Sequence, residues 1–152
     1  MSTPTGKIDR KPALALIEIE PDLLNIHSHK RGLFSKRSID NHLLLWSKEG
    51  ITKPLLRTLD KALKREAPDM FKLIQIYMGD RKSRQIGSLQ ICLDLATKGW
   101  SLPMIRDELY LQLMKQTNEN PNIDSLQRGW ELIGKINSNK KIFSFDINQV
   151  IF

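Results

Sequence analysis

Apolar residues recur at helical spacing over most of the chain between residues 38 and 138. At about 100° per residue, they gather on one face of each of several segments, separated by Gly, Pro and polar turn residues. The predicted helices cover 38–47, 52–67, 68–78, 88–99, 102–117, and a last stretch that Asp124 or Ser125 caps. Only residues 142–152, IFSFDINQVIF, show partial strand-like alternation. The pattern therefore predicts an all-α fold, a single compact bundle of about six helices.

Each helix is assigned a buried face by the same spacing. Pro68 lacks a backbone N–H and disfavours helix at Ala67, so it predicts a new helix or a kink at this point. The residues expected to face inward are Leu55, Leu56, Leu59, Leu63, Leu89, Cys92, Leu93, Ala96, Leu126, Trp130 and Ile133.

The helix over 102–117 combines an apolar stripe with polar residues. Leu102, Ile105, Leu109 and Leu113 share a stripe roughly 80° wide. Gln116 falls within that stripe, while Arg106 and Gln112 fall just outside its two edges. Unpaired buried polar groups cost a few kcal/mol each. Arg106, Gln112 and Gln116 are therefore predicted to form a structural polar network.

Composition divides the chain into three parts. Residues 1–29 contain three prolines without sustained periodicity and are interpreted as a flexible N-terminal arm. The helical domain is assigned to 30–136. Residues 137–152 are interpreted as a divergent tail.

Four stretches carry a resemblance to a known family: FKLIQIYMGD (71–80), ATKGW (96–100), RDELYLQLMKQTNENP (106–121) and RGWEL (128–132). In order and spacing they resemble the myosin tail homology 4 (MyTH4) domain. This domain occurs in unconventional myosins, in a plant kinesin and in some Rho-family GTPase-activating proteins. HKRGLFSKRSI (29–39) resembles the last of these branches. Pro68 and the segment after RGWELI depart from the family.

The positive charge is concentrated in one stretch. The chain carries a net charge of +7, and residues 30–84 alone hold fourteen basic and six acidic residues. Such a stretch favours an acidic partner. The resemblance implies microtubules, whose tubulin tails are acidic, or an acidic cargo protein. The candidate contact residues are Lys30, Arg31, Lys61, Lys64, Arg65, Arg81 and Lys82.

Nucleic-acid binding is the weaker interpretation of this charge. Single-strand binding needs exposed aromatic side chains among the basic groups. Trp46, Trp100 and Trp130 each lie within or beside an apolar helical pattern, which favours packing in the core.

Catalysis, metal binding and cofactors find no support in the sequence. Asp107 and Glu108 point about 100° apart on a helix and cannot flank one substrate. Arg106 is walled in by apolar neighbours, which favours a structural role over that of an arginine finger. The three histidines His27, His29 and His42 match no zinc spacing. The single Cys92 lies on an apolar face and is expected to be a buried structural thiol.

The remaining features favour a cytoplasmic, cytoskeleton-associated interaction module. No apolar run approaches the length of about 20 residues that a membrane span needs. One cysteine forms no internal disulfide, and the N-terminus does not resemble a secretory signal. The alternative function is a regulatory module of a Rho-family GTPase-activating protein without its catalytic domain.

Overall fold

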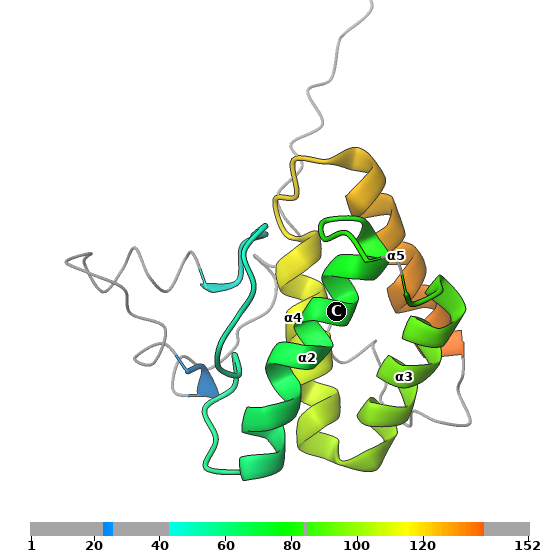
Figure 1. Ribbon diagram of the computed structural model, residues 1–152. Helices are drawn as coiled ribbons and strands as arrows, with labels where there is room; N and C mark the ends of the chain where they lie inside the picture. Colours follow the sequence, from blue (N-terminus) through cyan, green and yellow to red (C-terminus); the bar gives the residue numbers. More distant parts are fainter. Residues whose placement is uncertain (1–22, 26–42, 84, 139–152) are drawn as a thin grey trace, which may run out of the picture.

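The computed structural model describes residues 23–25, 43–83 and 85–138, and within these ranges it contains four helices and no strand (Figure 1). They are α2 (Lys61–Met78), α3 (Ser88–Ser101), α4 (Pro103–Thr117) and α5 (Ile123–Ser138). All four pack against one another, and α4 passes behind α2 in the view of Figure 1. The all-α class is confirmed, while two of the six predicted helices are not found as predicted.

The first difference from the predicted helices concerns the break expected at Pro68. Residues 61–78 form one unbroken helix with Pro68 inside it, so a new helix does not begin at this proline. An interior proline costs about 3 kcal/mol. Ala67, Met70 and Phe71 beside it are fully buried, and this burial outweighs the local preference of the proline.

The second difference concerns the helix predicted over 52–67, since residues 52–60 are not helical. The stretch is instead joined to residues 23–25 by an antiparallel bridge between Leu24 and Leu56. The Asn25 N–H donates to the Leu55 carbonyl at 2.7 Å, and the Arg57 N–H donates to the Leu23 carbonyl at 2.8 Å. Leu55 is fully buried as predicted, whereas Leu59 is 91% exposed and does not face inward. Of the predicted helix over 38–47, residues 38–42 lie outside the described residues, and residues 44–47 are not helical.

Helix ends are set by local caps. The Asp60 carboxylate accepts a hydrogen bond from the Leu63 N–H at 2.8 Å and starts α2. Gly79 ends α2 in the left-handed conformation, with φ of 85°. The cap of α5 is neither Asp124 nor Ser125: the Asn122 side-chain oxygen accepts hydrogen bonds from the N–H groups of both residues.

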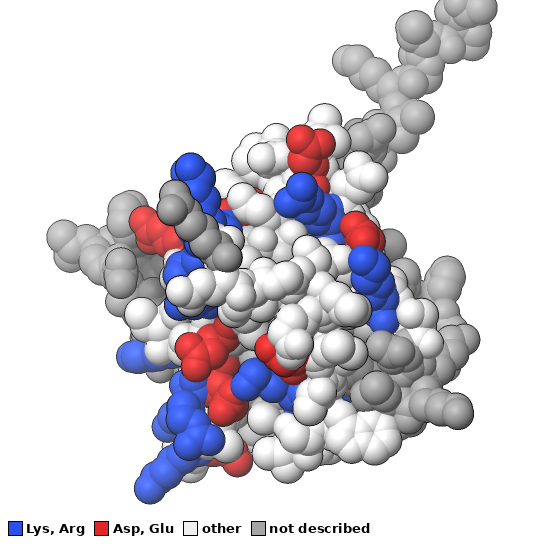
Figure 2. All heavy atoms as spheres, turned by 45° about the vertical axis from the view of Figure 1, so that its right-hand side comes forward, with Lys and Arg blue, Asp and Glu red and all other residues white. Residues whose placement is uncertain are grey.

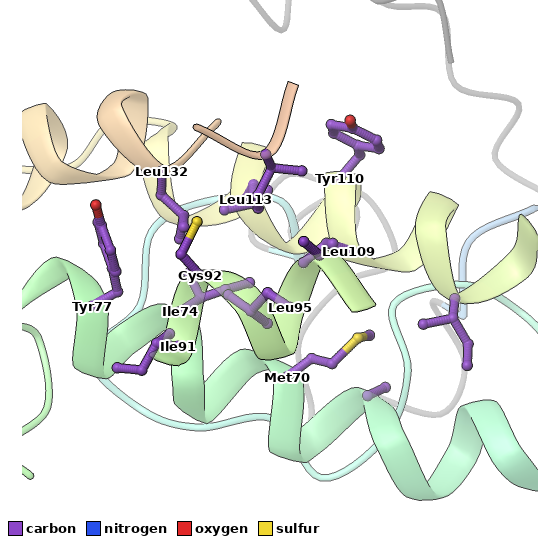
Figure 3. Packing of buried hydrophobic residues seen from close by; sticks show 14 of the residues in the cluster. Met70, Ile74, Tyr77, Ile91, Cys92, Leu95, Leu109, Tyr110, Leu113 and Leu132 are labelled. Carbon is purple, nitrogen blue, oxygen red and sulfur yellow. The ribbon is translucent and has the colours of Figure 1, made fainter. Parts of the chain in front are cut away.

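The core draws on all four helices. Figure 3 shows Ile74 of α2, Ile91 of α3, Leu109 of α4 and Leu132 of α5 converging from their helices. The Cys92 thiol lies in this cluster, which confirms it as a buried side chain, and burial raises its pKa. α4 contacts the other three helices, and its residues 108–113 are buried on all sides of the helix, so it lies at the centre of the bundle.

Several apolar residues lie outside the core, against the prediction. On α3 the buried face passes through Ile91 and Leu95, so Leu89 and Leu93 point outward. This helix carries more apolar residues than one face can hold, and their spacing alone does not select which of them face the bundle. The corrected residues and their exposures are Leu89 74%, Leu93 49%, Trp100 60% and Trp130 50%.

Gly129 brings α5 close to its neighbours. A Cβ atom at this position would lie 2.7 Å from Thr117 Cγ2 and 2.8 Å from Met78 Cε. Both distances are shorter than real contacts of a Cβ atom. The glycine therefore allows α5 to pack directly against the C-terminal ends of α2 and α4.

None of the helices in the described ranges is long and apolar enough to cross a membrane.

Candidate functional site

The central helix α4 holds a buried carboxylate. Glu108 is fully buried, and its two oxygens accept hydrogen bonds from the Leu55 and Leu56 N–H groups, each at 2.8 Å. The Gln112 amide donates a third at 2.8 Å. Burial raises the pKa of Glu108, and these three hydrogen bonds oppose that rise. Glu108 therefore holds segment 54–56 against the bundle through these hydrogen bonds.

The two glutamines of α4 continue this polar layer. Gln112 also donates to the Ala67 carbonyl, directly before Pro68, at 2.9 Å. The Gln116 oxygen accepts from the Ser47 N–H at 3.2 Å, and its amide donates to Asp80 Oδ2 at 3.0 Å. Both side chains are fully buried and join α4 to segments distant in sequence.

Arg106 lies on another side of α4. It is half-buried and is placed about 200° around the helix from Glu108. Burial raises the pKa of both Asp107 and Tyr110, and the positive charge of Arg106 opposes that rise. Gln112 and Gln116 thus belong to the polar layer around Glu108, while Arg106 projects from a different side of the helix.

Two further members of this layer were missed by the sequence analysis. The Gln75 amide donates to the carbonyls of residues 47, 48 and 49, at 3.2, 3.2 and 3.0 Å. The Lys115 ammonium donates to the Leu45 carbonyl and is only 5% exposed. For Gln75 a signal was present, because a glutamine within the broad apolar arc of 70–78 needs a buried partner.

Lys115 gives the fold a pH dependence. Burial lowers its pKa from 10.5 to about 8. Between these values the folded state releases the proton while the unfolded chain keeps it, so stability rises with pH in this window. Relative to Lys115→Met, the wild type should gain roughly 1 kcal/mol or more between pH 7.5 and about 10.

Urea unfolding at a series of pH values measures this difference. The comparison with Lys115→Met cancels Cys92 and Tyr110, whose raised pKa values act in the opposite direction. A difference between the two proteins that stays constant over this range would show that Lys115 is not titrating in the folded state.

The candidate basic residues fall into separate groups. Lys61, Lys64 and Arg65 are exposed on the first turns of α2 and share one stripe with Lys72. We call these four residues the α2 basic stripe. Lys and Arg side chains gather, with some Asp and Glu, at the lower left of Figure 2, the end of the bundle where α2 begins.

The other candidates lie elsewhere. Arg81 is half-buried and Lys82 exposed, just after the far end of an 18-residue helix that is about 27 Å long. Lys30 and Arg31 lie outside the described residues. All seven were grouped by charge alone, whereas the length of α2 separates Lys61, Lys64 and Arg65 from Arg81 and Lys82.

One acidic residue beside the stripe is neutralised by ion pairs. Glu66 pairs with Lys98 of α3 and with Arg65, whose Nε lies 3.4 Å from Glu66 Oε1. Hydrogen bonding to Lys98 is the main cause that lowers the pKa of Glu66. The pairing with α3 offsets one of the negative charges on this end of α2.

The described residues offer no catalytic arrangement or metal cluster. Asp107 is exposed and Glu108 is buried, so the adjacent carboxylates do not face a common substrate. No group of three or more His, Cys, Asp and Glu in these ranges is placed to hold a metal ion. His27, His29 and His42 lie outside them. The described residues form a helical core with a buried polar layer on α4 and a row of exposed basic side chains on α2.

Sequence comparison connects this chain with motor proteins. The family model "MyTH4 domain" matches residues 92–138. Unconventional myosin heavy chain 6 of Caenorhabditis elegans is 37% identical over 109 residues, 66% of this chain and 5% of that protein. Kinesin-like protein KIN-14I of Oryza sativa subsp. japonica is 35% identical over 122 residues, 71% of this chain and 10% of that protein. The chain therefore spans only a small part of the length of these relatives.

Solved structures give the same result. The human Myosin 7b C-terminal MyTH4-FERM domain in complex with the harmonin-a PDZ3 domain matches with a TM-score of 0.57 and 33% identity, over 69% of this chain and 24% of that one. The Dictyostelium discoideum Myosin VII MyTH4-FERM MF2 domain matches with a TM-score of 0.61 and 25% identity, over 70% and 21%. This chain thus contains a MyTH4 domain, matched by the family model over residues 92–138, which is a non-catalytic binding domain shared with myosins and a kinesin.

Proposed function

We propose that this domain binds microtubules, or another acidic protein surface of the cytoskeleton, through the α2 basic stripe. The observation that carries the proposal is the exposure of Lys61, Lys64, Arg65 and Lys72 along one side of a single helix. From Lys61 to Lys72 the stripe is about 16 Å long. A rigid row of cations of this length suits a repeating acidic surface.

The comparisons support a cytoskeletal setting. The relatives named above are myosins and a kinesin-like protein, and the human neighbour was solved with a protein domain bound. A location on cytoskeletal filaments follows from the proposal. The braced core supports it physically, since a binding surface on a rigid helix loses less conformational entropy when a partner docks.

Co-sedimentation with microtubules over a series of salt concentrations tests the proposal. Binding through exposed charges should weaken steeply as salt rises, because the Debye length falls to about 8 Å at 0.15 M. Binding to DNA and RNA is measured at matched salt. Absence of the protein from the pellet even at low ionic strength, or tighter retention by nucleic acid, would contradict the proposal.

A regulatory role beside a Rho-family GTPase-activating domain is the second candidate. It rests on the resemblance of residues 29–39 to that branch, and these residues lie outside the described ranges. Under this alternative the purified chain should not stimulate GTP hydrolysis alone, while it should alter the rate of an attached catalytic domain. An unchanged rate in the linked protein would remove this candidate.

A further inference from the structure

Helix α3 presents an apolar stripe that no described residue covers. Leu89, Leu93 and Trp100 fall within about 40° of one another around the helix. Their exposures are 74%, 49% and 60%. Figure 2 looks onto the side of the bundle that carries α3, and few charged side chains lie in the middle of this side. A run of this kind on one helix marks a surface that another element covers.

The stripe borders the side of α3 on which α5 lies. Cys92 and Ala96 form the edge of the buried face nearest to it, by helical spacing. The Cys92 thiol is close enough to Glu131 and Lys135 for their charges to act on its pKa. Leu132 and Ile136 belong to the same core cluster as Cys92, and Figure 3 shows Leu132 beside it. The last two turns of α5 therefore run along this side of α3.

The chain continues directly from that position. After Ser138, the last residue of α5, come fourteen residues, NKKIFSFDINQVIF. Fourteen extended residues span at most about 46–50 Å, whereas the 14-residue α3 is about 21 Å long. This segment is long enough to pass along the whole of α3.

Its sequence suits an apolar surface. Phe143, Phe145 and Ile147 alternate with Ser144, Asp146 and Asn148. In an extended segment, alternate residues share one side, so the three apolar side chains can face the bundle together.

We propose that residues 139–152 dock on the α3 apolar stripe and cover Leu93 and Trp100. A second copy of the chain is the less favourable occupant for two reasons. The net charge of +7 repels another copy. The tail, in contrast, is tethered next to the stripe and so has a high effective concentration there.

Tryptophan provides the test, because Trp46, Trp100 and Trp130 are the three tryptophans of the chain. The full chain is labelled with 5-fluorotryptophan, and the Trp100 resonance is assigned with Trp100→Phe. The wild type is then compared with Phe143→Ser/Phe145→Ser/Ile147→Ser. The expected result is a change in the Trp100 chemical shift together with a larger solvent isotope shift.

Trp46 is the internal reference, since its indole N–H donates to Asp80 Oδ2 at 3.1 Å near the far end of α2. Its resonance should stay in place, which shows that the core is intact in the variant. A Trp100 signal that is the same in both proteins would overturn the proposal. A Trp100 signal that moves when the wild type is diluted would overturn it in favour of a second copy.

Discussion

Replacing Glu108 with glutamine should lower the free energy of unfolding by about 2–4 kcal/mol. The carboxylate accepts three hydrogen bonds, from the N–H groups of Leu55 and Leu56 and from the Gln112 amide. A glutamine keeps only one acceptor oxygen and turns an NH₂ group toward one of these donors. At least one buried donor then loses its partner, and buried unsatisfied groups cost about 1–3 kcal/mol each. Urea denaturation of both proteins measures the loss.

Asp107→Asn is the matched control for this change. It is the same chemical replacement one residue earlier, at an exposed position. It should change stability by no more than about 0.5 kcal/mol. Equal effects of Glu108→Gln and Asp107→Asn would show that the buried carboxylate does not hold segment 54–56.

Gly129→Ala should destabilise the domain by about 1–3 kcal/mol, because the added methyl group overpacks the contact of α5 with its neighbours. Met78 Cε can move, since it is the end of a flexible side chain. Thr117 Cγ2 has less freedom, since the Thr117 hydroxyl donates to the carbonyls of Leu113 and Met114 at 3.0 and 3.2 Å. The helix must then shift, which the thermal unfolding midpoint records.

Gly134→Ala provides the comparison within the same helix. A Cβ atom at Gly134 would meet no atom within 4 Å. Alanine there should stabilise α5 by up to about 1 kcal/mol, through its better helix propensity. The two substitutions are therefore expected to act in opposite directions. A stabilising Gly129→Ala would contradict the close packing described at this position.

The parts of the fold predicted from sequence are those fixed by local spacing. Ile105, Leu109 and Leu113 share one face because helical periodicity places them there, and all three are buried. Gln112 and Gln116 could be singled out because polar residues within or beside an apolar stripe need hydrogen-bond partners. Most of those partners were not accessible, since Ala67, Ser47 and Asp80 lie 36 to 69 residues away from these glutamines along the chain.

The errors arise where tertiary packing overrides local preference. Pro68 breaks helices in isolation, yet burial of its neighbours keeps α2 continuous. Trp100 and Leu93 look like core residues by composition, but the bundle already fills its interior with Ile91 and Leu95. When a helix has apolar residues on more than one face, the local sequence does not show which face packs against the other helices.

The sequence predicted that the candidate site is basic, but it did not predict which of the basic residues lie together on the surface. The spacing of Lys61, Lys64 and Arg65 places them together on any helix that contains them. Their distance from Arg81 and Lys82 depends on the length of α2, which the assumed break at Pro68 concealed. Lys72 joins the stripe only because the helix is unbroken.

The most direct measurement is microtubule co-sedimentation of Lys64→Glu/Arg65→Glu beside the control Lys82→Glu/Arg128→Glu. Both variants make the same change in net charge at exposed positions, and only the first alters the α2 basic stripe. We expect the stripe variant to bind at least about tenfold more weakly, equivalent to about 1.4 kcal/mol, while the control stays within about twofold of the wild type. Equal binding by the two variants would contradict the stripe as the contact surface.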